Sequence, residues 1–133
     1  MRHFVLMAKK RKASHKLKLC DNLWSRLVKI RAGFKCEHCW KTEKLNSHHL
    51  FTRTNYSTRF DLDNGICLCS WCHTMSSKFS AHGTPMIFDE WIISERWQDR
   101  YDRLKFKTKQ VRDKDYDKIE KYLLDETNKL LAE

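Results

Sequence analysis

The first third of the chain carries apolar residues at helical spacing. Trp24, Leu27 and Val28 recur at intervals that place them on one face of a helix. Asp21 precedes them and is a suitable N-cap, and Gly33 follows them as a residue type at which helices commonly end. The sequence therefore predicts a helix that begins near Asp21 and ends before Gly33.

The helical period disappears between residues 34 and 63. Cysteine, histidine and hydroxyl-bearing residues are frequent in this part of the chain. The pattern favours a tight turn followed by a two-stranded ribbon. A short helix is expected from about Ser70 to about Phe79, because the run from His82 to Pro85 would break it.

Helical spacing returns from Phe88 onward, with Trp91 and Ile92 on the same face. A final helix is predicted from about Asp115 to about Leu131. Its single apolar stripe is suited to packing on the rest of the chain or to a homodimer contact through this C-terminal helix. The stripe comprises Tyr116, Ile119, Leu123, Leu124 and Leu130.

Composition places these elements in one small α+β domain. The chain has 133 residues, of which 41% are hydrophobic, and this length supports one compact core. Only three glycines and one proline are present, which argues against a turn-rich β-sandwich and favours substantial helix. We divide the chain into an N-terminal arm at residues 1–18, a central core at 19–85 and a helical extension at 86–133 packed on that core.

Positive charge is concentrated towards the N-terminus. The formal net charge is +10, to which the arm contributes +7, the central core +4 and the extension −1. This distribution is typical of a protein that binds a polyanion, although a soluble basic protein with a solvated tail would share it. The densest basic run is a candidate DNA contact and consists of Lys9, Lys10, Arg11 and Lys12.

The six cysteines favour metal binding over disulfides. The N-terminus lacks the order of charged and apolar regions found in a secretory signal peptide, so we expect a reducing, cytoplasmic setting in a bacterial or phage-infected cell. No apolar run approaches the roughly 20 residues needed to cross a bilayer, and no membrane partner is expected.

Four of the cysteines form two Cys-x-x-Cys pairs, Cys36 with Cys39 and Cys69 with Cys72. This spacing lets a tight turn direct two thiolates at one ion, and two such turns complete a tetrahedral structural Zn²⁺ site. Because 29 residues separate the pairs, the metal would close a loop that holds other residues. Cys67 could compete for Cys72, but Cys69 reproduces the spacing of the first pair. Cys20 and Cys67 are then expected to be small buried residues.

The loop between the pairs contains residue types that suit phosphodiester hydrolysis, which needs an activated water, a cation on the phosphate and a stabilised leaving oxygen. Neighbours on a strand point to opposite faces, so His48 and His49 are expected to differ in role: one binds a metal and the other takes a proton from water. Asn64 is placed to organise the partner that fixes the tautomer of that base. We call the four paired cysteines the clamp cysteines. His73 directly follows the last of them, Cys72, and on a short helix it can reach the same metal.

The order Cys-x-x-Cys, His-His, Asp-Asn and Cys-x-x-Cys-His resembles the HNH (ββα-metal) endonucleases, in particular their zinc-stabilised phage and bacterial branch. The similarity covers roughly residues 21–80, and the run from Arg59 to Asn64 is also similar to lambdoid phage recombination endonucleases that act on branched DNA. The resemblance implies a ββα-metal core. His48 and His73 would bind a catalytic divalent ion, His49 would be the general base, and Asn64 would hold the loop and orient that base.

The chain departs from this family pattern at one position. Several members carry another His or Asn where this sequence has Ser77, and water or His82 would have to complete the metal site. The working ion is expected to be Mg²⁺ or Mn²⁺, although histidine ligands also suit Ni²⁺, Co²⁺ or Zn²⁺.

Residues beside this site are expected to hold DNA. Arg53, Arg59 and Lys78 are candidate phosphate contacts. Trp40 and Trp71 are expected to pack around the cysteines rather than to stack on bases.

Together these features predict a DNA endonuclease in which His49 activates water. One alternative is a Holliday-junction resolvase within the same family. A second is a zinc module that binds nucleic acid without cleaving it, and a third is a zinc-organised protein-interaction domain.

Overall fold

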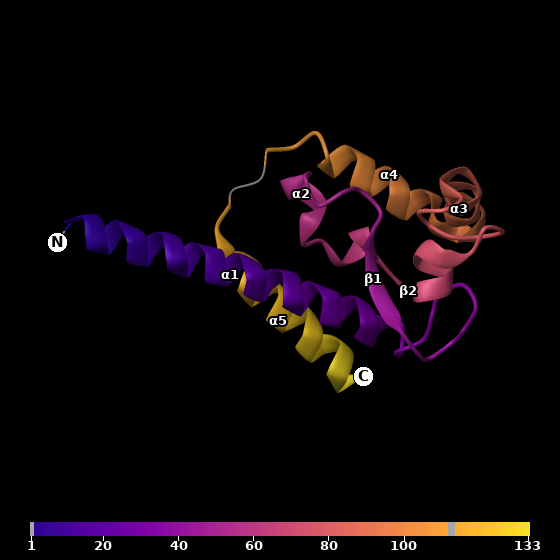
Figure 1. The fold of residues 1–133 in the computed structure, drawn as a ribbon, viewed down its shortest axis with the longest axis horizontal. Coiled ribbons are helices and arrows are strands. Elements are labelled where there is room, and N and C mark those ends of the chain that lie inside the picture. The colour runs from indigo at the N-terminus through magenta and orange to yellow at the C-terminus, as the bar shows by residue number, and fades with distance from the viewer. Residues whose placement is uncertain (1, 112–113) are drawn as a thin grey trace.

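The chain folds into an α+β structure in which a long N-terminal helix packs across a two-stranded ribbon (Figure 1). The computed structural model describes residues 2–111 and 114–133, with the side chains of 13–94, 97–111 and 114–133. The α-helices are Arg2–Arg31 (α1), Tyr56–Arg59 (α2), Pro85–Ile92 (α3), Gln98–Lys107 (α4) and Tyr116–Ala132 (α5). The strands are Leu45–His49 (β1) and Gly65–Cys69 (β2), and single helical turns span Leu62–Asn64 (η1), Trp71–Met75 (η2) and Ile93–Trp97 (η3).

Helix α1 ends where the sequence predicts. Gly33 has a φ of +67°, which glycine adopts without a steric penalty. The amides of Gly33 and Phe34 donate to the carbonyls of Ile30 and Lys29, at 2.9 Å each. These two bonds form a Schellman ending and satisfy carbonyls that the helix would otherwise leave free.

The start of α1 differs from the prediction. Asp21 does not cap the helix, which begins at Arg2, so residues 2–18 of the expected arm are its first turns and extend past the elements packed on its second half (Figure 1). For the turn directly before Asp21 the reason is tertiary: Leu17 and Cys20 pack in one cluster with Ile119 and Leu123 of α5. Residues before Asp21 thus gain buried contacts only once α5 is in place.

The predicted C-terminal helix is confirmed as α5. The carboxylate of Asp115 caps it by accepting hydrogen bonds from the amides of Asp117 (3.1 Å) and Lys118 (3.2 Å). Most of its apolar stripe packs on α1 and the adjoining core, whereas Leu124 is 42% exposed. The stripe is therefore used largely within the chain, and a homodimer through this helix stays a prediction.

The ribbon pairs β1 with β2 in antiparallel register, His48 opposite Ile66 and His49 opposite Gly65. The second strand lies outside the range 34–63 in which the ribbon was predicted. Every residue of β2 is buried, so it lacks the alternation of polar and apolar positions that marks a strand with one solvated face.

The two faces of the ribbon are covered by different elements. On one face α1 packs closely, and the Ser47 hydroxyl donates to the Ser25 carbonyl of α1 (2.6 Å). On the other face Ile66 and Leu68 share a cluster with Phe88 and Ile92 of α3. His49 and Gly65 belong to the α1 face, and His48 belongs to the α3 face.

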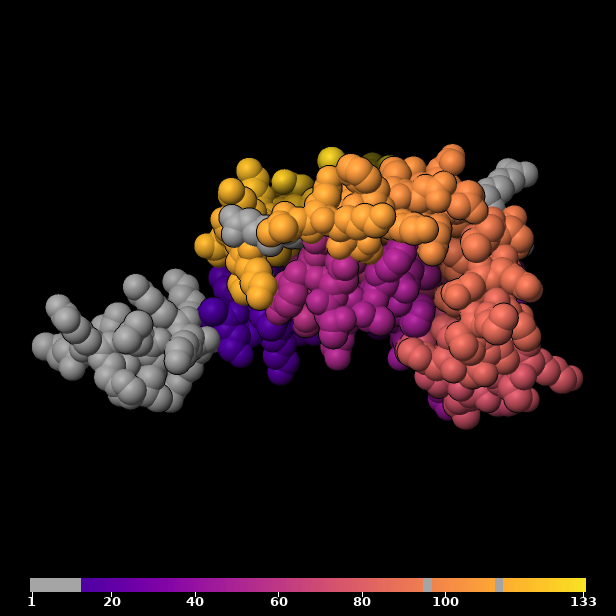
Figure 2. Space-filling view, turned by 90° about the horizontal axis from the view of Figure 1, so that it is seen from above, coloured from indigo at the N-terminus to yellow at the C-terminus, as the bar shows by residue number. Residues whose placement is uncertain are grey.

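Helix α4 packs on the segment between β1 and β2. Figure 2 shows this contact, with the orange residues lying against the magenta ones. Lys107 of α4 pairs with the buried carboxylate of Asp61 (2.5 Å). Arg100 donates to the carbonyls of Asp63 (2.5 Å) and Gly65, and burial lowers its pKa to about 10. These contacts fix the turn that leads into β2.

Gly65→Ala is expected to lower the free energy of unfolding by about 1–3 kcal/mol. A Cβ at this position would lie 2.2 Å from Val28 Cγ2 and 2.7 Å from Trp24 Cζ2, so α1 would have to move off the ribbon. Urea denaturation of the two proteins measures the difference. Gly33→Ala is the matched control, because a Cβ there meets nothing within 4 Å and only its positive φ opposes the change. An undiminished free energy of unfolding in Gly65→Ala would contradict this close packing.

Candidate functional site

The four clamp cysteines come together as the sequence predicts. The Sγ atoms of Cys36, Cys39, Cys69 and Cys72 all lie within 4.8 Å of one another. The Sγ atoms of Cys39 and Cys69 are 3.5 Å apart, close to the roughly 3.8 Å edge of a tetrahedron with Zn–S bonds of about 2.3 Å. The cluster could therefore hold a structural metal such as Zn²⁺.

The backbone supports sulfur ligands at this cluster. The amide of Cys39 donates to Cys36 Sγ, and the amide of Cys72 donates to Cys69 Sγ, at 3.5 Å each. His38 Nδ1 lies 3.4 Å from Cys72 Sγ, and its ring stacks on Phe79 at 3.5 Å. Amide and imidazole donors stabilise negative charge on sulfur, which suits thiolate ligands.

The other two cysteines are excluded from the cluster. Cys67 is on the α1 face of the ribbon, in the core cluster that also contains Cys20. Burial raises the pKa of each of these two thiols to about 11, so both remain protonated near neutral pH. The alternative in which Cys67 replaces Cys69 as a partner of Cys72 is not supported by this geometry.

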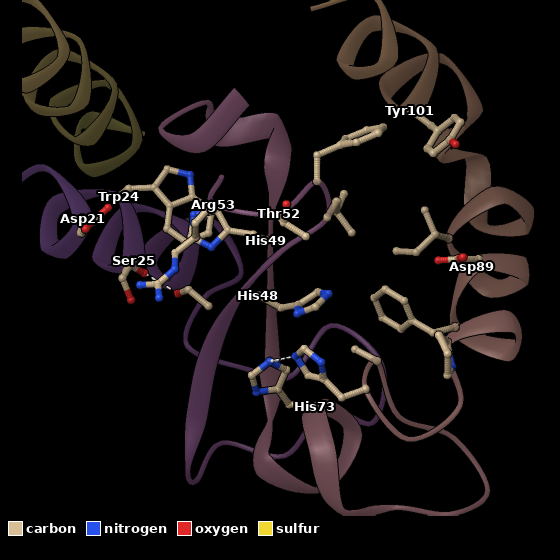
Figure 3. Close-up of a pocket in the computed structure, with 18 of the residues that line it drawn as sticks. Asp21, Trp24, Ser25, His48, His49, Thr52, Arg53, His73, Asp89 and Tyr101 are labelled. Atoms are coloured by element: carbon tan, nitrogen blue, oxygen red, sulfur yellow. Dashed lines mark hydrogen bonds between the residues drawn. The ribbon is translucent and has the colours of Figure 1, made fainter. Parts of the chain in front are cut away.

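A second cluster of metal-ligating side chains lies on the α3 face of the ribbon. It brings together ring nitrogens of His48 from β1, His73 from η2 and His82 from the loop before α3, all within 4.8 Å of one another. His73 Nε2 and His82 Nε2 are 3.1 Å apart (Figure 3). The donor set of three imidazoles fits a transition-metal ion.

The loop that supplies His82 replaces the second half of the helix predicted for residues 70–79. The helical turn ends at Met75, and an irregular segment begins at Ser76. The Ser76 hydroxyl accepts hydrogen bonds from the amides of Lys78 and Phe79 (3.2 Å each). The amides of Ala81 and His82 then donate back to the carbonyls of Cys72 and His73, at 2.9 Å each.

This return of the chain places His73 and His82, two candidate metal ligands, beside each other. His82 is hydrogen-bonded through its backbone to His73, which itself directly follows a clamp cysteine. Ser77 is exposed and does not belong to the histidine cluster. Sequence reasoning named His82 only as an alternative; its spacing from His73 matches no helical period, so no pattern placed the two together.

Two imidazoles of the cluster, those of His48 and His73, are held in their neutral form. Burial, followed by the positive charge that His73 and His82 would carry, lowers the pKa of His48 to about 3. Burial likewise lowers the pKa of His73. Neutral imidazole is the form that binds a metal ion, so the environment prepares these side chains as ligands.

His49 lies on the opposite face of the strand from His48, as the alternation predicts. Its ring stacks on Trp24 of α1 with centroids 3.8 Å apart, and its Nε2 lies 3.1 Å from the Arg59 carbonyl oxygen. A carbonyl only accepts, so Nε2 carries the proton in this bond. Burial lowers the pKa of His49 to about 4, which leaves Nδ1 of the neutral ring with a free lone pair.

Asn64 fixes the chain that follows β1 through side-chain hydrogen bonds to Phe51. Its Oδ1 accepts a hydrogen bond from the amide of Phe51 (2.7 Å), and its Nδ2 donates one to the carbonyl of the same residue (2.9 Å). The side chain is fully buried. The expected role of holding the loop matches this geometry, whereas the group that fixes the His49 tautomer is the Arg59 carbonyl.

A cleft of about 930 Å³ gives access to both kinds of histidine (Figure 3). One wall is formed by α1 residues, including Asp21 and Ser25, and the opposite wall by α3 residues such as Asp89. The floor carries His48, His49, His73 and His82. The residues after β1, including Thr52 and Arg53, line the same cleft.

The candidate DNA contacts divide into three groups. Arg53 is exposed and lines the cleft, while Lys78 is exposed but lies outside its lining. Arg59 is paired within the chain: its Nε and Nη2 donate to both carboxylate oxygens of Asp21 (3.0 and 2.7 Å), and its side chain is 13% exposed. A phosphate contact by Arg59 stays a prediction. The side chains of Lys9, Lys10, Arg11 and Lys12 lie outside the described residues.

No family model, curated protein or solved structure with which the chain was compared matches it. Within the described part of the chain, none of the helices is both long and apolar enough for a transmembrane segment.

Proposed function

We propose that this protein is a metal-dependent DNA endonuclease of the HNH kind. The observation that carries the proposal is that His49 and the cluster of His48, His73 and His82 line one cleft from opposite faces of one strand. The strand–strand–turn order of β1, β2 and η2 is compatible with a ββα-metal core. A structural metal at the four cysteines would hold η2, and with it His73, against the ribbon.

The chain's own residues suit the steps of phosphodiester hydrolysis. His49 accepts a proton from water at Nδ1, while the Arg59 carbonyl holds Nε2–H and Trp24 restrains the ring plane. His48, His73 and His82 would hold a divalent ion, which would supply positive charge to the scissile phosphate and the leaving 3′-oxygen. Arg53 stands on the same cleft and positions the phosphate. Asn64 acts as a positioning residue through the loop that carries Arg53.

The ligand set favours some ions over others. Three nitrogen donors without a carboxylate suit Mn²⁺, Co²⁺, Ni²⁺ or Zn²⁺, whereas Mg²⁺ prefers oxygen ligands. We therefore expect activity with Mn²⁺, Co²⁺ or Ni²⁺ to exceed activity with Mg²⁺ at equal concentration.

Cleavage assays test this proposal. Supercoiled plasmid and a four-way junction built from oligonucleotides are incubated with the protein and each ion, and the products are separated on a gel. Nicked or linear plasmid that forms only with a divalent ion supports the proposal. A protein that binds these DNAs but leaves them intact with every ion would instead be the non-catalytic zinc module.

Arg53→Ala is expected to weaken binding to duplex DNA several-fold and to reduce the slope of log affinity against log salt by about 1, the value of one phosphate contact. Fluorescence polarisation at several salt concentrations, without added divalent ion, measures both. Lys121→Ala is the matched control, since Lys121 is also exposed but does not line the cleft and is not a candidate DNA contact. An equal loss in the two variants would show that the cleft has no special part in binding.

A further inference from the structure

The surface around the cysteine cluster carries large exposed aromatic side chains. Trp40 is 73% exposed, Trp71 is 52% exposed and Met75 is 64% exposed. The expectation that the two tryptophans pack around the cysteines is therefore wrong. Trp40 directly follows Cys39, and Trp71 lies between Cys69 and Cys72, so the cysteine cluster holds them on neighbouring turns. We call Trp40, Lys41, Trp71 and Met75 the tryptophan surface.

Both the backbone conformation and the exposure of Trp40 are unusual for a tryptophan. Its φ is +71°, a left-handed conformation that glycine adopts freely and that a bulky side chain rarely takes. Its side chain also leaves most of its apolar area in water. The positive φ closes the turn in which the amides of Cys36 and Trp40 donate to the carbonyls of Lys41 (2.7 Å) and Cys36 (3.0 Å). This turn directs the indole into solvent, where a ligand would cover its apolar face.

The charges beside these rings are positive. Lys41 Nζ lies 6.0 Å from the centroid of the Trp71 ring. Lys35 and Lys44 are exposed in the same segment, and among the described residues neither they nor Lys41 forms an ion pair. Of the acids in this segment, Glu37 accepts the amide of Cys67 (2.7 Å), which leaves Glu43 as the exposed one.

We propose that the tryptophan surface binds unpaired nucleotides of a nucleic-acid ligand. Bases stack on the indoles of Trp40 and Trp71, and Lys41 meets the phosphate between them. The ring faces of bases inside a duplex are already stacked, so this surface recognises single-stranded segments or the open strands of a branched DNA. The inference rests on the proposed function in that the partner of the cleft is DNA, but it concerns a separate surface.

Two variants test the proposal. Trp40→Gly removes the indole and places glycine where φ is positive, so the fold should be retained or stabilised. Trp71→Ala removes the second ring. Val111→Ala is the matched control, because Val111 is a fully exposed apolar side chain elsewhere on the chain.

Binding is measured by fluorescence polarisation with a labelled oligothymidine strand and with a blunt hairpin duplex, without added divalent ion. Each tryptophan variant is expected to bind the single strand roughly 5- to 100-fold more weakly and the duplex within about twofold of wild type. Retention of zinc and an unchanged or raised thermal midpoint show that Trp40→Gly is folded.

Unchanged single-strand binding in both variants would overturn the proposal and leave a protein as the partner of this surface. An equal loss on single strand and duplex would also overturn it. Plasmid cleavage by the wild type distinguishes this inference from the nuclease proposal. If the wild type cleaves duplex plasmid and the tryptophan variants bind single strands normally, only the present inference is contradicted. If the wild type binds single strands through these rings but cleaves no DNA, only the nuclease proposal is contradicted.

Discussion

His49→Ala is expected to abolish DNA cleavage, with a fall of about 10²–10⁴-fold in the rate constant. The ring has a fixed tautomer, a free Nδ1 and a pKa lowered to about 4, so it is a neutral acceptor at the pH of the assay. Among the described residues that line the cleft, His49 is the only imidazole on the α1 face of the ribbon. Single-turnover cleavage of a labelled duplex with a saturating divalent ion measures the effect.

The variant should still bind DNA and remain folded. His49→Gln is a second variant that keeps a polar side chain against Trp24, and His15→Ala is the matched control because His15 is exposed on α1 away from the cleft. Polarisation without divalent ion is expected to give wild-type affinity for all three. If His49→Ala and His49→Gln cleave as fast as His15→Ala, His49 is not the base.

Cys36→Ala is expected to release the structural metal and unfold the central part of the chain. Cys36 is fully buried, and the metal that it would share with three other thiols joins the turn after α1 to the end of β2. Zn²⁺ binding to such sites contributes on the order of 10 kcal/mol of folding free energy, more than a small domain has in reserve. Because His73 follows Cys72 directly, the histidine cluster should be lost with it.

Elemental analysis and circular dichroism measure this outcome. Wild type is expected to carry one tightly held Zn²⁺ per chain at the cysteines, and Cys36→Ala to carry none and to lose its cooperative thermal transition. Cys20→Ala is the matched control, a change at another buried thiol that belongs to the apolar core and not to the cluster. A Cys36→Ala protein that keeps its zinc and its melting transition would rule out a structural site at these residues.

The local features of the fold were predictable because they depend on neighbouring residues. Gly33 ends α1 through its own backbone freedom, and Asp115 begins α5 through bonds to the next turn. The spacing Cys-x-x-Cys predicts a pair of thiols at one turn, and alternation along β1 predicts that His48 and His49 face opposite ways. Each of these needs only a few consecutive residues.

Other features depend on partners far along the chain. The sequence places Arg59 among candidate phosphate contacts, but folding brings it to Asp21, and the bidentate pair removes its charge from solvent. The same folding delivers the Arg59 carbonyl to His49. Leu17 and Cys20 become part of the core because α5 packs on them, and Trp40 becomes exposed because the turn from Cys36 to Lys41 directs it outward.

The sequence by itself determined the α+β class, the cysteine cluster, the C-terminal helix and the opposite placement of two adjacent histidines. Only the tertiary structure decided that His82 joins His48 and His73, where β2 lies, and which arginine is exposed on the cleft. The division has one physical cause. Helix ends, metal-binding turns and strand alternation follow from local backbone geometry, whereas a cleft and its charges are set by contacts between residues tens of positions apart.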